Sequence, residues 1–70
     1  MPLIEIHMLE GRTANEKKKL LASVTDAVQE AIGAPLASIR VWINELKLED
    51  YMASGELAAD HKKPPSGSDK

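Results

Sequence analysis

The chain has 70 residues, 43% of them hydrophobic, and a formal net charge of −2 at pH 7. A chain of this length forms one small domain, which buries a smaller share of its surface than a larger protein does and usually gains stability by association. The acidic balance argues against non-specific binding of nucleic acid, which needs a basic surface, and the absence of cysteine excludes disulfides and thiolate metal sites.

Two further features of the sequence bear on where the protein works. No apolar run approaches the roughly 20 residues that a membrane-spanning helix needs. The N-terminus lacks the basic and apolar segments of a signal peptide. Since a chain without cysteine also suits a reducing compartment, we expect a cytoplasmic protein with no membrane partner.

Residues 3–9 have the alternating pattern of a β-strand, and this strand begins directly after Pro2. Its two faces differ in polarity. The apolar face carries Ile4, Ile6 and Met8. The mixed face carries Leu3, Glu5, His7 and Leu9.

A helix is expected from about residue 14 to residue 32. Thr13 and Glu16 have the spacing of a capping box, in which each side chain bonds the backbone amide of the other residue. Apolar residues then recur at three- and four-residue spacing: Leu20, Val24, Ala27, Val28 and Ala31. Gly33 fits the left-handed position after the last turn, and Pro35 prevents the helix from continuing.

Residues 38–46 alternate like a second strand, with Ile39, Val41 and Ile43 on one face. Strand, helix and strand in this order predict a βαβ unit with parallel strands and a right-handed crossover. One helix cannot cover both faces of a parallel sheet, and the sheet edges also stay unpaired. We therefore expect copies of the chain to extend the sheet and to cover its open face.

The C-terminal part of the chain changes character. Residues 47–50 predict a polar loop, and residues 51–57 predict a short hairpin or arm that contacts a neighbouring copy. Lysine, proline, serine and glycine dominate residues 61–70, which predicts a disordered tail. The predicted fold class is α+β, with a single βαβ domain over residues 1–60 that ends in the hairpin.

Several segments of the chain resemble the 4-oxalocrotonate tautomerase family, and together they span residues 2–57. These segments are Pro2-Leu3-Ile4, Leu9-Glu10-Gly11-Arg12-Thr13, Ala34-Pro35-Leu36, Ile39-Arg40-Val41 and Gly55-Glu56-Leu57. The amino-terminal proline, the Glu-Gly-Arg-Thr turn and an arginine in the second strand form a specific combination. The resemblance implies a subunit that dimerises into a four-stranded sheet, with three dimers in a hexamer of identical or homologous chains.

The resemblance also implies a reaction. The family isomerises unsaturated 2-hydroxy acids by moving a proton between carbons through a dienol, with neither a metal nor an organic cofactor. The expected partner is therefore a small unsaturated keto or enol acid of the 2-hydroxymuconate type.

Pro2 is the candidate general base and acid. Removal of Met1 would leave the proline nitrogen as a free secondary amine, which can take and give a proton, whereas an amide nitrogen cannot. Desolvation and nearby cations disfavour the protonated amine and so lower its pKa. The alternative is a proline that merely starts a strand, where no amide partner is needed.

Arg12 and Arg40 are the candidate cations, which the resemblance assigns to neighbouring subunits. Arg12 would bind the substrate carboxylate distal to the keto group, since guanidinium suits bidentate pairing. Arg40 would contact the 2-hydroxy or keto oxygen and one carboxylate oxygen, and would stabilise the charge of the dienolate. The alternatives are an exposed turn position or an ion pair with Glu10 for Arg12, and an ion pair with Glu5 or Glu45 for Arg40.

Three more residues match substrate-lining positions by resemblance. Leu9 and Ser38 would contact the substrate, although a core leucine and a strand-start serine explain them nearly as well. Tyr51 stands where the family has a phenylalanine, and its ring would keep the site dry. The tyrosine hydroxyl and the following Met52-Ala53-Ser54 depart from the family pattern.

Two other functions stay open at this point. One is hydrolytic dehalogenation of 3-haloacrylates, whose enzymes carry an additional arginine where this chain has Leu9, and a water-activating carboxylate for which no candidate stands near Ala53. The other is a non-catalytic oligomeric interaction module. Retention of Met1 would favour that module, because the Pro2 nitrogen would then be an amide.

Overall fold

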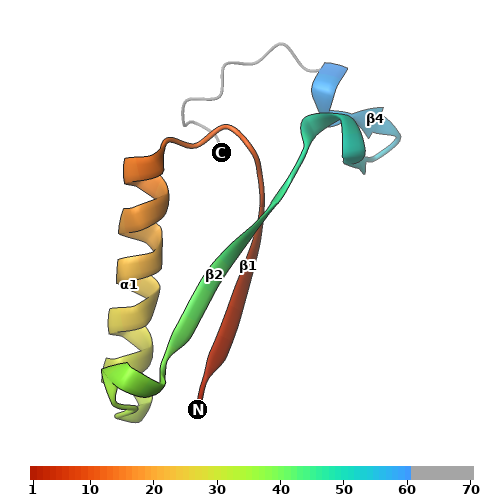
Figure 1. Ribbon diagram of the computed structural model, residues 1–70. Coiled ribbons are helices and arrows are strands. Elements are labelled where there is room, and N and C mark those ends of the chain that lie inside the picture. Colours follow the sequence, from red (N-terminus) through yellow and green to blue (C-terminus); the bar gives the residue numbers. More distant parts are fainter. Residues whose placement is uncertain (61–70) are drawn as a thin grey trace.

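The computed structural model describes residues 1–60, in which a βαβ unit is followed by a C-terminal hairpin (Figure 1). The helix and strands are β1 (Leu3–Leu9), α1 (Ala14–Ile32), β2 (Arg40–Leu46), β3 (Met52–Ala53) and β4 (Glu56–Leu57). Short 3-10 turns join or follow them: η1 (Leu36–Ser38), η2 (Leu48–Asp50) and η3 (Ala58–Asp60). The tail predicted for residues 61–70 lies outside the described residues.

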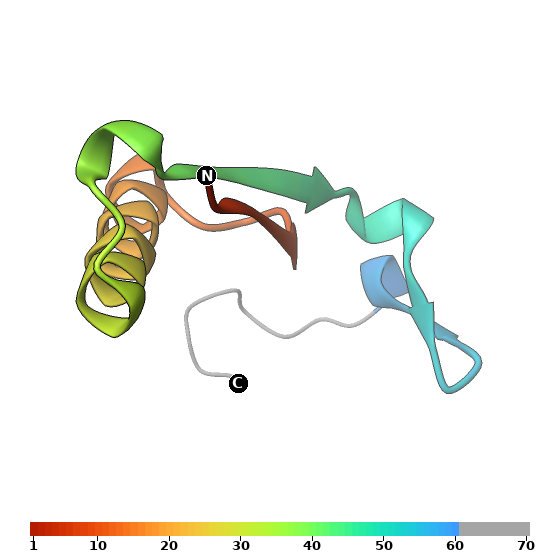
Figure 2. The same cartoon turned by 90° about the horizontal axis from the view of Figure 1, so that it is seen from below.

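The sheet of the βαβ unit is a parallel pair of strands. Leu3 lies opposite Arg40 at its start, and Leu9 lies opposite Leu46 at its end. The helix α1 runs beside β2 and in the opposite direction (Figure 1), and it stands to one side of the sheet in the second view (Figure 2). The predicted fold class, with parallel strands and a C-terminal hairpin, is therefore confirmed.

The burial of the strand residues follows the alternation of the sequence. The partly buried strand residues include Ile4, Ile6, Met8, Val41 and Ile43. The exposed ones include Leu3, Glu5, His7, Arg40, Trp42 and Asn44. Lys17 of α1 reaches Glu45, which shares the partly buried face of β2. The helix therefore covers the apolar face, as the pattern predicts, and the opposite face stays open.

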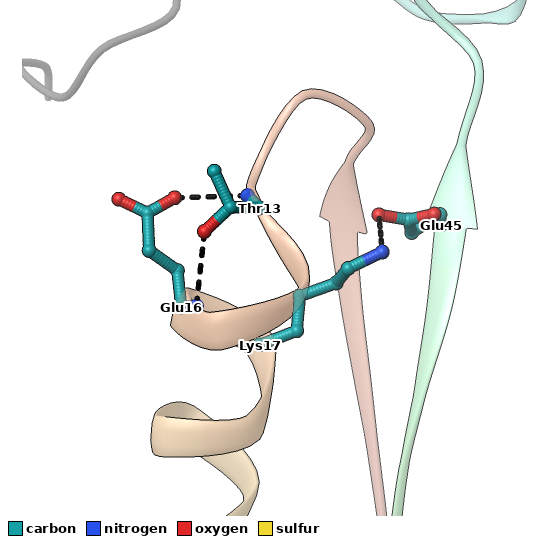
Figure 3. Close-up of polar contacts among 4 residues, drawn as sticks. All are labelled: Thr13, Glu16, Lys17 and Glu45. Carbon is teal, nitrogen blue, oxygen red and sulfur yellow. Dashed lines mark hydrogen bonds and ion pairs between the residues drawn. The ribbon is translucent and has the colours of Figure 1, made fainter.

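The two ends of α1 are closed by the predicted caps. Thr13 Oγ1 accepts from the backbone amide of Glu16 at 3.1 Å, and Glu16 Oε1 accepts from the amide of Thr13 at 3.0 Å (Figure 3). At the other end Gly33 takes the left-handed conformation, with φ 70° and ψ 18°, and its amide donates to Gln29. Lys17 Nζ lies 2.9 Å from Glu45 Oε2, which ties the first turn of the helix to β2 (Figure 3).

The strand β2 begins later than the alternation predicts, because residues 36–38 form the turn η1. The backbone amide and the hydroxyl of Ser38 both donate to the carbonyl of Pro35 at 2.9 Å. A serine side chain that bonds nearby backbone favours a turn over a strand. In the same way residues 48–50 form a 3-10 turn within the predicted polar loop, closed by a bond from the Asp50 amide to the Lys47 carbonyl.

The structure confirms the predicted C-terminal hairpin, and its contact with a neighbouring copy stays a prediction. Its strands β3 and β4 are antiparallel, with Met52 opposite Leu57. Ser54 and Gly55 between them both have positive φ, 55° and 76°, as a two-residue turn of type I′ requires. The hairpin lies beyond the end of β2, on the side away from α1 (Figures 1 and 2).

The described part of a single copy has almost no core. Among residues 1–60, Ile39 alone is buried, at 8% exposure. Large apolar side chains remain exposed: Met1, Leu3, Ile32, Leu36, Trp42, Tyr51 and Met52. Hydrophobic burial is the main force that stabilises a fold, and a single copy leaves these side chains exposed to solvent. Within residues 1–60 no helix is both long enough and apolar enough to cross a membrane.

Candidate active site

Pro2 and Arg40 lie side by side at the amino end of the sheet. The backbone amide of Arg40 donates to the carbonyl of Pro2 at 3.1 Å, which extends the parallel ladder by one bond. Pro2 is partly buried, and Met1 before it is exposed. Backbone hydrogen bonding therefore sets the position of the candidate base relative to the start of β2.

The guanidinium of Arg40 folds back onto the turn before its strand. Its Nη1 donates to the carbonyl of Ala37 at 2.7 Å and to that of Ile39 at 3.4 Å. Within residues 1–60 no carboxylate pairs with Arg40, so the alternative in which Arg40 pairs with Glu5 or Glu45 is wrong. A guanidinium carries further N–H donors beyond Nη1, which leaves Arg40 able to bind an anionic ligand.

The two carboxylates considered as alternative partners of Arg40 have other contacts. Glu5 Oε2 accepts from Asn44 Nδ2 at 3.0 Å, and Glu5 Oε1 lies 3.7 Å from His7 Nε2 on the open face. Glu45 pairs with Lys17 on the helix side. The pleat of the strands explains part of this, since Glu45 and Arg40 stand on opposite faces of β2.

Arg12 lies at the opposite, carboxyl end of the sheet. The turn before it is held by Glu10, whose amide donates to Leu46 at 2.9 Å and whose Oε2 accepts from the amide of Leu48 at 3.0 Å. The alternative in which Arg12 pairs with Glu10 is therefore wrong. Arg12 Nη1 instead lies 3.6 Å from Glu16 Oε2, and the Arg12 side chain is 39% exposed.

The substrate-lining candidates divide between the same two ends. Ser38 stands in the turn next to Arg40, with its hydroxyl bound to the Pro35 carbonyl. Leu9 is the last residue of β1 and is partly buried. Tyr51 begins the hairpin, where its carbonyl accepts from Ala58 and its side chain is exposed. Their roles toward a substrate stay predictions.

A single chain does not gather the candidate residues into one place. Pro2, Ser38 and Arg40 lie where the strands start, and Leu9 and Arg12 lie where the seven-residue strand β1 has ended. A strand of that length spans roughly 20 Å, which exceeds the reach of one side chain. A site with both arginines next to Pro2 therefore requires more than one copy of the chain.

The contact between Arg12 and Glu16 was missed at the level of sequence. The two residues are four apart at the start of the helix, and that spacing is a signal for a surface ion pair. The capping box explains only one carboxylate oxygen of Glu16, and it gave no reason to look for a partner of the other oxygen. The described residues contain no group of three or more histidines, aspartates or glutamates that could hold a metal ion.

Comparison with known proteins shows the family of the chain. Residues 2–61 match the family described as Tautomerase enzyme. The 2-hydroxymuconate tautomerase of Pseudomonas putida is 43% identical over 60 residues, which cover 86% of this chain and 95% of that protein. The 2-hydroxymuconate tautomerase of Bacillus subtilis (strain 168) is 40% identical over 60 residues, which cover 86% of this chain and 97% of that protein.

Solved structures share the fold. A 4-oxalocrotonate tautomerase isozyme of Methylibium petroleiphilum has a TM-score of 0.78 at 38% identity, and the match covers 83% of this chain and 94% of that one. The heterohexamer 4-oxalocrotonate tautomerase of Chloroflexus aurantiacus J-10-fl has a TM-score of 0.79 at 33% identity, over 86% of this chain and 97% of that one. These relatives are tautomerases by name, so they give no support to a dehalogenase or to a purely structural module.

Proposed function

This chain belongs to the tautomerase family and is a tautomerase, and from that premise we propose that it converts 2-hydroxymuconate-type dienol acids to the conjugated keto acids. The amine of Pro2 serves as general base and general acid once Met1 has been removed. The enol O–H bond breaks, the electron pair moves through the diene, and a C–H bond forms at the distal carbon. The step conserves protons and electrons, so the chemistry itself calls for no redox partner.

The observation that carries this proposal is the pairing of Pro2 with Arg40 at the amino end of the sheet. The bond from the Arg40 amide to the Pro2 carbonyl joins the residue before β1 to the first residue of β2, so the candidate base lies at the end of the sheet where β2 carries an arginine. Cationic side chains near the proline nitrogen favour its unprotonated form, which is the form a base needs.

The two arginines have different tasks in this proposal. Arg40 binds the 2-hydroxy or keto oxygen together with one carboxylate oxygen, and it stabilises the negative charge that develops on the dienolate. Arg12 binds the carboxylate at the far end of the diacid, for which a planar guanidinium is well shaped. Leu9, Ser38 and Tyr51 line the space between them.

The assembly belongs to the same proposal, because the site depends on it. We propose a homohexamer made of three dimers, each dimer with a four-stranded sheet. The open sheet face, the exposed apolar side chains such as Trp42 and the separation of Arg12 from Pro2 along β1 all support association. A relative of this fold is named as a heterohexamer, so pairing with a homologous second chain is the competing arrangement.

The sharpest test removes the free amine without removing the proline. A variant with one leucine inserted between Met1 and Pro2, checked by intact mass, turns the proline nitrogen into an amide. We expect its ketonisation rate on 2-hydroxymuconate to fall by a factor of about 10² to 10⁴. Light scattering serves as the control that the oligomer is intact. A full rate from this variant would reject Pro2 as the base.

A further inference from the structure

Glu16 contacts two different groups through its two carboxylate oxygens. Oε1 accepts from the backbone amide of Thr13 at 3.0 Å, as part of the helix cap (Figure 3). Oε2 lies 3.6 Å from Nη1 of Arg12. In a single copy the Arg12 and Glu16 side chains are 39% and 52% exposed.

We propose that Glu16 is a positioning and specificity-determining residue that acts through Arg12. This inference rests on the proposed function, in which Arg12 binds the distal carboxylate of the substrate. In the free enzyme Glu16 holds the guanidinium near the start of α1. When a diacid arrives, its distal carboxylate must share or replace the contact that Glu16 makes.

The helix cap makes this competition unavoidable. A carboxylate on an ordinary surface side chain could rotate away when a second anion approaches. Glu16 is held by its bond to the Thr13 amide, so its negative charge stays beside the arginine. The carboxylate of Glu16 and the distal carboxylate of the substrate repel each other when both lie beside the Arg12 guanidinium. Glu16 therefore weakens the binding of substrates that carry a distal carboxylate.

The same geometry predicts which substrates are affected. A dienol monoacid such as 2-hydroxy-2,4-pentadienoate has no distal carboxylate and does not compete for Arg12. Glu16 therefore lowers the preference of the enzyme for diacids over monoacids. Added salt weakens the effect, because both side chains are exposed and their charges are screened.

The test is the substitution Glu16→Gln. A glutamine at this helix position can still accept from the Thr13 amide, so the cap is kept while the charge is removed. We expect the KM for 2-hydroxymuconate to fall about two- to five-fold, the range of an exposed ion pair, and the KM for 2-hydroxy-2,4-pentadienoate to change much less. Glu30→Gln is the matched control, since it removes the same charge from the exposed far end of α1.

Two arms make the result decisive. In an Arg12→Ala background Glu16→Gln should have no further effect on the KM for the diacid. An equal shift for both substrates, or a shift that persists without Arg12, would overturn the inference and leave Glu16 as a helix cap only. If Arg12→Ala raises the diacid KM while Glu16→Gln changes nothing, the inference alone fails. If Arg12→Ala leaves the diacid KM unchanged, the proposed role of Arg12 fails as well.

Discussion

The two ends of the β1–β2 sheet hold their candidate residues by different means. At the amino end, backbone hydrogen bonds place Pro2 beside Arg40, and backbone carbonyls accept from the Arg40 guanidinium. At the carboxyl end, side chains do this work, since Glu16 contacts Arg12 and Glu10 anchors the turn. The acceptors of the amino end belong to the backbone and are kept when a side chain is substituted, whereas the carboxylates of the carboxyl end are lost when Glu10 or Glu16 is replaced. The amino end is therefore suited to constant chemistry, and the carboxyl end to adjustable recognition.

The largest expected effect comes from combining one variant from each end. The leucine-insertion variant and Arg12→Ala should each lose most of the activity on 2-hydroxymuconate, the insertion variant by a factor of about 10² to 10⁴ because its proline nitrogen is an amide. If a site takes these residues from different copies, oligomers reassembled from both variants regain roughly a quarter of the sites, because copies combine at random across a repeated interface. The measurement is the ketonisation rate after joint refolding of the two variants.

In the control, each variant is refolded alone and the two refolded samples are then mixed. Activity that stays at the level of that control would mean that Pro2 and Arg12 of the same chain act together, contrary to their separation along β1. Repeating the mixture with the leucine-insertion variant and Arg40→Ala shows whether Arg40 acts with the Pro2 of its own chain or with that of another copy. That pairing is informative because Arg40 is adjacent to Pro2 in its own chain.

The next effect in size concerns Arg40 itself. Arg40→Ala should lower kcat by a factor of about 10² to 10³, since it removes a donor to the developing oxyanion. Arg40→Lys is the matched control, because it keeps the charge but loses the planar fork of donors. Steady-state kinetics on 2-hydroxymuconate provides the measurement. A kcat for Arg40→Ala within a factor of about two of the parent would remove Arg40 from the proposed chemistry.

The open sheet face between the two ends should be the site of assembly. Trp42 is 43% exposed there in a single copy. Truncating a tryptophan that association buries costs about 3 kcal/mol, so Trp42→Ala should dissociate at much higher protein concentration than the parent. Light scattering over a dilution series measures this change, and Trp42→Phe serves as the control that keeps an aromatic ring. Unchanged dissociation would place the interface on another face.

The smallest effect is expected from the helix cap at the carboxyl end. Thr13→Ala removes the side-chain acceptor for the Glu16 amide and should lower the free energy of unfolding by about 1 kcal/mol. Thermal unfolding followed by circular dichroism measures the loss. Thr13→Ser keeps an acceptor and should stay close to the parent. If serine and alanine destabilise equally, the hydrogen bond is not the source of the stability.

Most of the fold could be predicted from local patterns. The capping box at Thr13, the spacing of apolar residues and the glycine at position 33 correctly predicted the bounds of α1. The alternation in residues 3–9 correctly predicted β1 and its apolar face. The turn η1 was not predicted, because Ile39 and Ser38 fit the strand alternation and only the bonds to the Pro35 carbonyl reveal the turn.

The candidate site was predictable as a set of residues but not as an arrangement. Pattern and resemblance selected Pro2, Arg12 and Arg40, yet the ion pairs weighed as alternatives for the two arginines are absent from residues 1–60. Arg40 binds backbone carbonyls, and Arg12 contacts Glu16. Which partner a long charged side chain finds depends on the pleat and register of the strands, and residue types alone do not contain that information.

The sequence by itself determined the elements, their order and the residue that can become a terminal amine, because caps, turns and periodicity act over only a few residues. Only the tertiary structure decided that Pro2 and Arg40 share one end of the sheet while Arg12 lies at the other. It also decided that residues 1–60 of a single copy leave one sheet face open and bury almost nothing. The physical reason is that register and packing bring together residues far apart in the chain.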